Sequence, residues 1–154
     1  MKANVSFGYG AEAVFSLIDA ETSRHAAFLR FQDGGSAYDA LKVHTKDKPT
    51  IDGYVFDAFR TVLSRFAGEG RYEIGNGDGG RKEHLLEFSL PDFDDNLYDA
   101  AGHEIVRYVV LSSTARWLMD RSFGEYAKMV AEDSNASMNR IVEMLRTRKF
   151  PIDD

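Results

Sequence analysis

The sequence predicts an α+β protein that is mainly α: a helical bundle of about four helices with one β-hairpin inserted between the second and third main helices. Four segments repeat apolar residues at steps of three and four, which is typical of amphipathic helices. One stretch, residues 71–90, instead alternates with a period of two around a glycine-rich loop. The 154 residues are 44% hydrophobic and 29% charged, a balance that suits one globular domain with one core.

The predicted single domain, residues 1–154, divides into four parts. Residues 1–9 form an extended N-terminal arm and residues 10–69 a helical half. Residues 71–90 form the hairpin, and residues 92–150 form a long antiparallel helix pair.

The helical half contains two of the main helices. The first begins near Ala11 and ends at "QDGG", and the second begins at "DKPT". There Asp47 can cap free N–H groups, and Pro49 suits a first helical turn because its missing N–H would have no partner. The segment between them, residues 36–48, fits a helical turn or an extended link.

The long helix pair opens with acidic residues and contains the predicted central helix. Asp92, Asp94, Asp95 and Asp99 crowd the first turns, where the helix dipole favours negative charge. "SFGE", from Ser122, matches a capping box that would start the last helix, and "EDSNAS" is where that helix would bend. The predicted core consists of Phe56, Phe59, Leu63, Phe66, Leu97, Ile105, Tyr108, Val109, Trp117, Met129, Ile141 and Leu145.

The loop "GNGDGG" raises the question of a phosphate site, because Gly75, Gly77 and Gly80 spell G-x-G-x-x-G. In a dinucleotide-binding fold these glycines open a helix whose N–H groups hold the pyrophosphate. Here Leu86 and Phe88 alternate with polar residues, which indicates a strand. The stretch is therefore a hairpin, since Asn-Gly and Asp-Gly allow the positive φ of tight turns.

Metal and catalytic motifs are incomplete. Asn76, Asp78 and Glu87 match three EF-hand positions, but Arg81 stands where that loop requires glycine. "HEIVR", from His103, lacks the second histidine of a zinc protease. The chain has no cysteine and no nucleophile elbow. We expect no catalytic residue, no cofactor, no metal and no enzymatic activity.

The charge pattern favours protein partners. A net charge of −6 disfavours sequence-independent nucleic-acid binding, which needs clustered Lys and Arg. A local contact with DNA stays open at the basic C-terminal end. The longest apolar-rich run carries charges and predicts no membrane span. The candidate partner contacts are Asn76, Asp78, Arg81 and Lys82 at the hairpin tip, and Arg140, Arg146, Arg148 and Lys149 at the basic end.

The order of elements resembles a known group of proteins. "ARWL" (residues 115–118) is followed about thirty residues later by "LRTRKFP" (residues 145–151). This order resembles small uncharacterised proteins that prophages and mobile elements of gut anaerobic bacteria encode. They are taken as virion-assembly proteins, akin to head–tail connector or neck adaptors.

The resemblance implies a non-enzymatic structural protein that forms a homo-oligomer, ring or virion assembly in the bacterial cytoplasm or the virion. It does not explain the glycine-rich tip. The alternative is a helical regulatory module that docks a partner or DNA through its basic C-terminal helix end.

Overall fold

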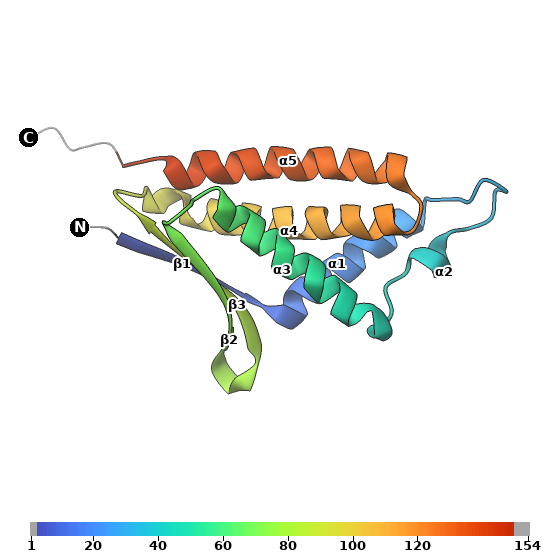
Figure 1. Ribbon diagram of the computed structural model, residues 1–154, viewed down its shortest axis with the longest axis horizontal. Coiled ribbons are helices and arrows are strands. Elements are labelled where there is room, and N and C mark those ends of the chain that lie inside the picture. The colour runs from blue at the N-terminus through green and yellow to red at the C-terminus, as the bar shows by residue number, and fades with distance from the viewer. Residues whose placement is uncertain (1–2, 150–154) are drawn as a thin grey trace, which may run out of the picture.

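The computed structural model describes residues 3–149 and confirms the mainly helical α+β class (Figure 1). The four long helices are α1 (Ala11–Ala26), α3 (Lys48–Ser64), α4 (Tyr98–Asp120) and α5 (Gly124–Arg146). The strands are β1 (Ala3–Gly10), β2 (Gly70–Asn76) and β3 (Lys82–Leu90). The shorter elements are α2 (Tyr38–Leu41) and three 3-10 turns, Thr45–Asp47, Asp78–Gly80 and Asp95–Leu97. Pro151, the last residue of the "LRTRKFP" motif, lies outside the described residues.

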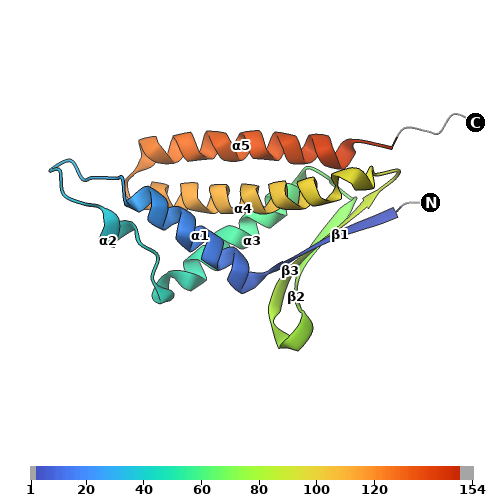
Figure 2. The same ribbon diagram turned by 180° about the vertical axis from the view of Figure 1, so that it is seen from behind.

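Helix α4 is the centre of the helical body. Figures 1 and 2 show α5 on one side of it and α1 and α3 on the other. Its residues Ile105, Val109 and Trp117 are fully buried, and the Trp117 indole N–H donates a 2.7 Å hydrogen bond to the Leu41 carbonyl. The predicted central helix is therefore confirmed, and it also anchors the segment that precedes α3.

The sheet has three strands rather than the two of a hairpin. The strand order is β1-β3-β2, and both pairings are antiparallel, with Val5 opposite Phe88 and Tyr72 opposite Leu86. Within the predicted N-terminal arm, residues 3–9 are extended, as expected, but they pair with β3 along their length. The reason lies in its alternation, since Val5 and Phe7 are buried while Ser6 between them is exposed.

One face of the sheet is buried against the helices and the other is open. On β3, His84, Leu86, Phe88 and Leu90 are buried, whereas the residues between them are only partly covered. The far end of the β2–β3 hairpin projects away from the helices (Figure 1). The sheet therefore packs one face against the helices, while the far end of its β2–β3 hairpin is exposed.

The hairpin loop uses other glycines than the Asn-Gly pair for its left-handed backbone. Gly79 and Gly80 have φ of 74° and 76°, whereas Gly77 has φ of −85°. A Cβ at Gly77 would overlap the Glu83 carboxylate, so a larger residue there would require this flexible side chain to move. No helix follows the glycines, so the interpretation of this stretch as a hairpin is confirmed.

Two capping predictions are wrong. Ser122 adopts φ of 70° in the turn, and the residue before α5 is Phe123, which makes no side-chain cap. The Asp47 carboxylate accepts from the His44 N–H at 2.9 Å rather than from α3. Helix α5 continues through "EDSNAS", where the Ser134 hydroxyl donates to the Ala131 carbonyl at 2.7 Å.

Two predicted core residues lie at the surface. Phe56 is 39% exposed and Met129 is 62% exposed. Each is adjacent in sequence to the buried stripe of its helix, which runs through Val55 on α3 and Val130 on α5. Leu63 and Leu97 are partly buried against the core, and the other predicted core residues are buried.

Candidate protein-interaction site

Strand β2 is an edge strand whose outward backbone groups can be identified. The Ser89 N–H donates to the Glu69 carbonyl at 2.6 Å, so Glu69 and Ser89 form a hydrogen-bonded pair between the two chain segments. Hydrogen-bonded and non-hydrogen-bonded pairs alternate along an antiparallel ladder, so every second residue of β2, starting from Gly70, points its N–H and C=O away from β3. Those residues are Gly70, Tyr72, Ile74 and Asn76. Within residues 3–149 no other backbone group bonds to them.

The opposite edge of the sheet, β1, is covered by the start of α4. The Tyr98 hydroxyl donates to the outward carbonyl of Ser6 at 2.5 Å, and the Tyr98 ring stacks on Phe7. The Tyr9 hydroxyl donates to the Gly102 carbonyl at 2.7 Å. Of the two sheet edges, β2 is therefore the open one.

A polar pair beneath β2, the buried His84 and the partly buried Tyr72, holds the strand in place. Tyr72 Oη and His84 Nδ1 are 2.6 Å apart, and both rings stack on Phe59. Burial raises the pKa of Tyr72, and the Asp52 carboxylate adds to that shift. Burial also lowers the pKa of His84, although Asp52 acts in the opposite direction. The histidine is accordingly neutral at neutral pH, and the edge strand is tied to the core.

Apolar side chains accompany the open edge. Ile74 is 51% exposed where the hairpin leaves the helices. The Phe56 ring lies 5.6 Å from the Tyr72 ring, and the Arg60 guanidinium lies over the face of the Phe56 ring. On the outer face of the same strand, Arg71 and Glu73 are exposed. The edge thus combines free hydrogen-bonding groups, apolar surface and alternating charge.

The hairpin tip brings part of the predicted contact set together. Asn76, Arg81 and Lys82 are exposed, and Asp78 begins the 3-10 turn between the strands. Arg81 and Lys82 line a pocket of about 480 Å³ that Lys48 and the start of α1 complete. The tip therefore presents Arg81 and Lys82 toward the start of α1, where both Lys48 and Glu12 line the same pocket.

The predicted basic end divides into two kinds of residue. Arg140 pairs with Glu104 at 2.8 Å, and Arg146 donates to the Arg65 carbonyl at 2.9 Å, so both serve contacts within the molecule. Arg148 and Lys149 are exposed, and their backbones pair with Phe93 and Asp92.

Arg148 and Lys149 adjoin the segment after Leu90, which lies at the opposite end of β3 from the hairpin tip. The nine residues of β3 span about 30 Å. The structure therefore does not bring the two predicted contact groups together.

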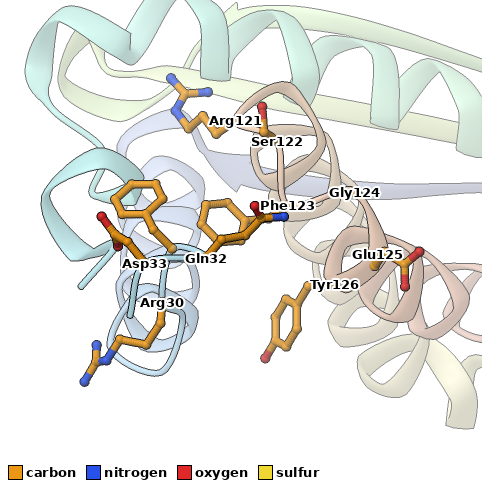
Figure 3. Close-up of a pocket in the computed structure, with 10 residues that line it drawn as sticks. Arg30, Gln32, Asp33, Arg121, Ser122, Phe123, Gly124, Glu125 and Tyr126 are labelled. Carbon is orange, nitrogen blue, oxygen red and sulfur yellow. The ribbon is translucent and has the colours of Figure 1, made fainter. Parts of the chain in front are cut away.

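A pocket of about 760 Å³ lies between the α4–α5 turn and the loop after α1 (Figure 3). In Figure 3 the side chains of Arg30, Glu125 and Tyr126 point in different directions. The Asp33 carboxylate accepts from the Gly35 N–H at 2.8 Å and so serves its own turn. The polar groups of this pocket do not converge on one point, as those of a binding site do.

Residues 3–149 contain no group of three or more His, Asp or Glu side chains placed to hold a metal ion. None of the helices there combines the length and apolar composition needed to cross a membrane. Comparison with protein-family models, curated proteins and solved structures finds no match.

Sequence reasoning missed the residues of the open edge. "RYEI" alternates charged residues with tyrosine and isoleucine, so it could have been predicted from the sequence that Arg71 and Glu73 share one face of the strand. That β2 rather than β1 is the open edge had no signal, because it depends on Tyr98 reaching Ser6 across 92 residues.

Proposed function

We propose that this protein is a non-enzymatic assembly protein that acts through protein–protein contacts. The observation that carries the proposal is the open β2 edge on a hairpin that projects from a closed helical body. An unpaired strand edge is a template for pairing with another chain. The helical body packs against the buried face of the sheet and so orients this edge, as an adaptor requires.

A phage-type role, akin to a connector or neck adaptor, is the form of assembly that we favour, and its support is the resemblance in the order of elements. Within the quoted motifs, Trp117, Leu118 and Leu145 are buried in the core. These motif residues therefore serve the packing of this chain, and a partner-binding surface has to lie elsewhere on it.

The experiment that tests this role combines the mass in solution with the identity of the neighbouring genes. We expect self-association at high concentration and genes for capsid or tail proteins nearby. A strict monomer, encoded away from any such genes, would refute the proposed function.

A second candidate is docking of DNA or an acidic partner, and the exposed side chains of Arg148 and Lys149 favour it. The variant R148E/K149E tests it without removing the hydrogen bond of Arg146. DNA binding would be measured by fluorescence anisotropy at two salt concentrations, with Lys42→Glu as the control for an exposed charge change. Salt-sensitive binding lost only in R148E/K149E supports this candidate, and absence of binding by the unmodified protein eliminates its DNA form.

A further inference from the structure

The open edge of β2 can pair with itself in a small number of ways. In an antiparallel pair related by a two-fold axis, outward-pointing residues must face outward-pointing residues of the second copy. Since Gly70, Tyr72 and Ile74 point outward, the axis has to pass through a residue of β2 rather than between two residues. The possible centres that leave substantial overlap are Arg71, Tyr72, Glu73 and Ile74.

Charge on the outer face distinguishes these centres. An axis at Arg71 places Arg71 of one copy opposite Arg71 of the second copy. An axis at Glu73 likewise places the two Glu73 side chains opposite each other. Like charges directly opposite are destabilising. An axis at Ile74 places Glu73 opposite glycine and leaves both charges unpaired. An axis at Tyr72 places Arg71 opposite Glu73 of the second copy, twice by symmetry. Only this register pairs every charge of the strand.

The geometry points to a second copy of this chain as the occupant of the β2 edge, and we propose that two copies pair antiparallel about Tyr72 to give one continuous six-stranded sheet. This inference rests on the proposed assembly function and names its surface. The pairing supplies about six main-chain hydrogen bonds, two at Tyr72 and two at each Gly70–Ile74 pair. Strand β2 contains neither proline nor lysine, which are devices that commonly protect an edge.

The side chains around the axis fit this register. Ile74, half exposed in one copy, lies beside Gly70 of the second copy, which has no side chain to obstruct it. A larger residue at Gly70 is disfavoured, because a Cβ there would lie 2.8 Å from the Leu63 side chain and 3.2 Å from the Glu87 carbonyl oxygen. Phe56 packs beside Tyr72 and so flanks the axis. Pairing therefore covers two of the exposed large apolar side chains.

Arg71 has a competing contact within its own chain. Its Nε lies 3.5 Å from the Glu87 carboxylate, and the side chain is 69% exposed. An exposed pair of this kind contributes little to stability, so Arg71 can turn toward the second copy. The paired surface is small beside the roughly 1,600 Å² of a standard interface. We therefore expect a weak, concentration-dependent dimer in the absence of other partners.

The test is sedimentation equilibrium of the full chain over concentrations up to about 1 mM, near the weak limit of specific association. The unmodified protein should dimerise. Glu73→Arg places like charges opposite each other twice and should weaken the dimer about tenfold or more. R71E/E73R restores opposite charges and should recover most of the affinity. Glu132→Arg, the same charge change on α5, should have no effect, and circular dichroism should show every variant folded.

The outcomes separate this inference from the proposed function. A dimer or larger oligomer that is indifferent to Glu73→Arg overturns pairing at β2 and leaves the assembly function standing. A weakened Glu73→Arg dimer that R71E/E73R does not rescue overturns the register about Tyr72. If the unmodified protein is monomeric over the whole concentration range, self-pairing is overturned. This holds even if β2 is then found to bind a different protein. The assembly function then fails only if no capsid or tail genes lie nearby.

Discussion

Tyr72 and His84 form a hydrogen bond 2.6 Å long that joins the edge strand β2 to the central strand β3 beneath the sheet. Phe59 of α3 stacks on both rings, so aromatic surface covers one side of the pair. This pair explains how an edge strand with an exposed outer face is still fixed to the core. It also links the proposed interaction surface to measurable stability.

Tyr72→Phe should destabilise the protein by about 1–3 kcal/mol, because it leaves the buried Nδ1 of His84 without its partner while keeping the stacked ring. Urea denaturation measures this free energy of unfolding. Tyr38→Phe is the matched control, since no hydrogen bond of the Tyr38 hydroxyl occurs in residues 3–149. Equal stability of the two variants would contradict a structural role for the Tyr72–His84 bond.

Stability should fall in mildly acidic solution because of His84. Burial lowers its folded pKa below the ordinary 6.5, so the unfolded chain binds more protons than the folded one in this range. The contribution of the neutral histidine is complete above the unfolded pKa and is lost as the pH falls below it. Thermal unfolding between about pH 7.5 and 5.5 measures the dependence.

His84→Phe should flatten that profile. The other histidines are common to both proteins, so the difference between the two slopes isolates His84. A slope unchanged by the substitution would mean that His84 does not titrate on unfolding in this range.

Phe56→Ser should weaken self-association and lower the free energy of unfolding by about 1–2 kcal/mol, because Phe56 is only partly exposed beside Tyr72. Met129→Ser on α5 is the control, since Met129 is also an exposed apolar residue but lies away from the sheet. Sedimentation of both variants checks the prediction. Equal weakening by both would place the contact somewhere other than β2.

Trp117→Phe should cost about 2–4 kcal/mol, because it leaves a cavity and removes the donor to the buried Leu41 carbonyl. Denaturant unfolding measures the loss. Phe28→Leu, at a side chain that is 74% exposed, should change stability by less than about 0.5 kcal/mol. A small effect at Trp117 would contradict the placement of α4 at the centre of the core.

The helices and the hairpin were predictable because local signals agree with the final packing. The stripe on α4 and the alternation of Leu86, Phe88 and Leu90 each report their own buried face. Strand β1 was only half recognised. Its extended form is local, but its pairing with β3 joins residues such as Val5 and Phe88, which are far apart in sequence.

The interaction site was less predictable than the fold. Charge drew attention to Arg140 and Arg146, yet both are used within the molecule, by Glu104 and by the Arg65 carbonyl. The open edge at Tyr72 depends on which strand α4 covers, and that is a tertiary property. Phe56 was assigned to the core for a similar reason, because a stripe read from sequence does not show which side the neighbouring elements occupy.

Residue-resolved amide hydrogen exchange at low and high protein concentration tests the central claim most directly. The N–H groups of Tyr72 and Ile74 point outward in the monomer, so they should exchange rapidly in dilute solution and become protected as concentration rises. The outward N–H of Gly8 on the β1 edge should not change with concentration. Rapid exchange of Tyr72 and Ile74 at concentrations where the protein is dimeric would contradict assembly through β2.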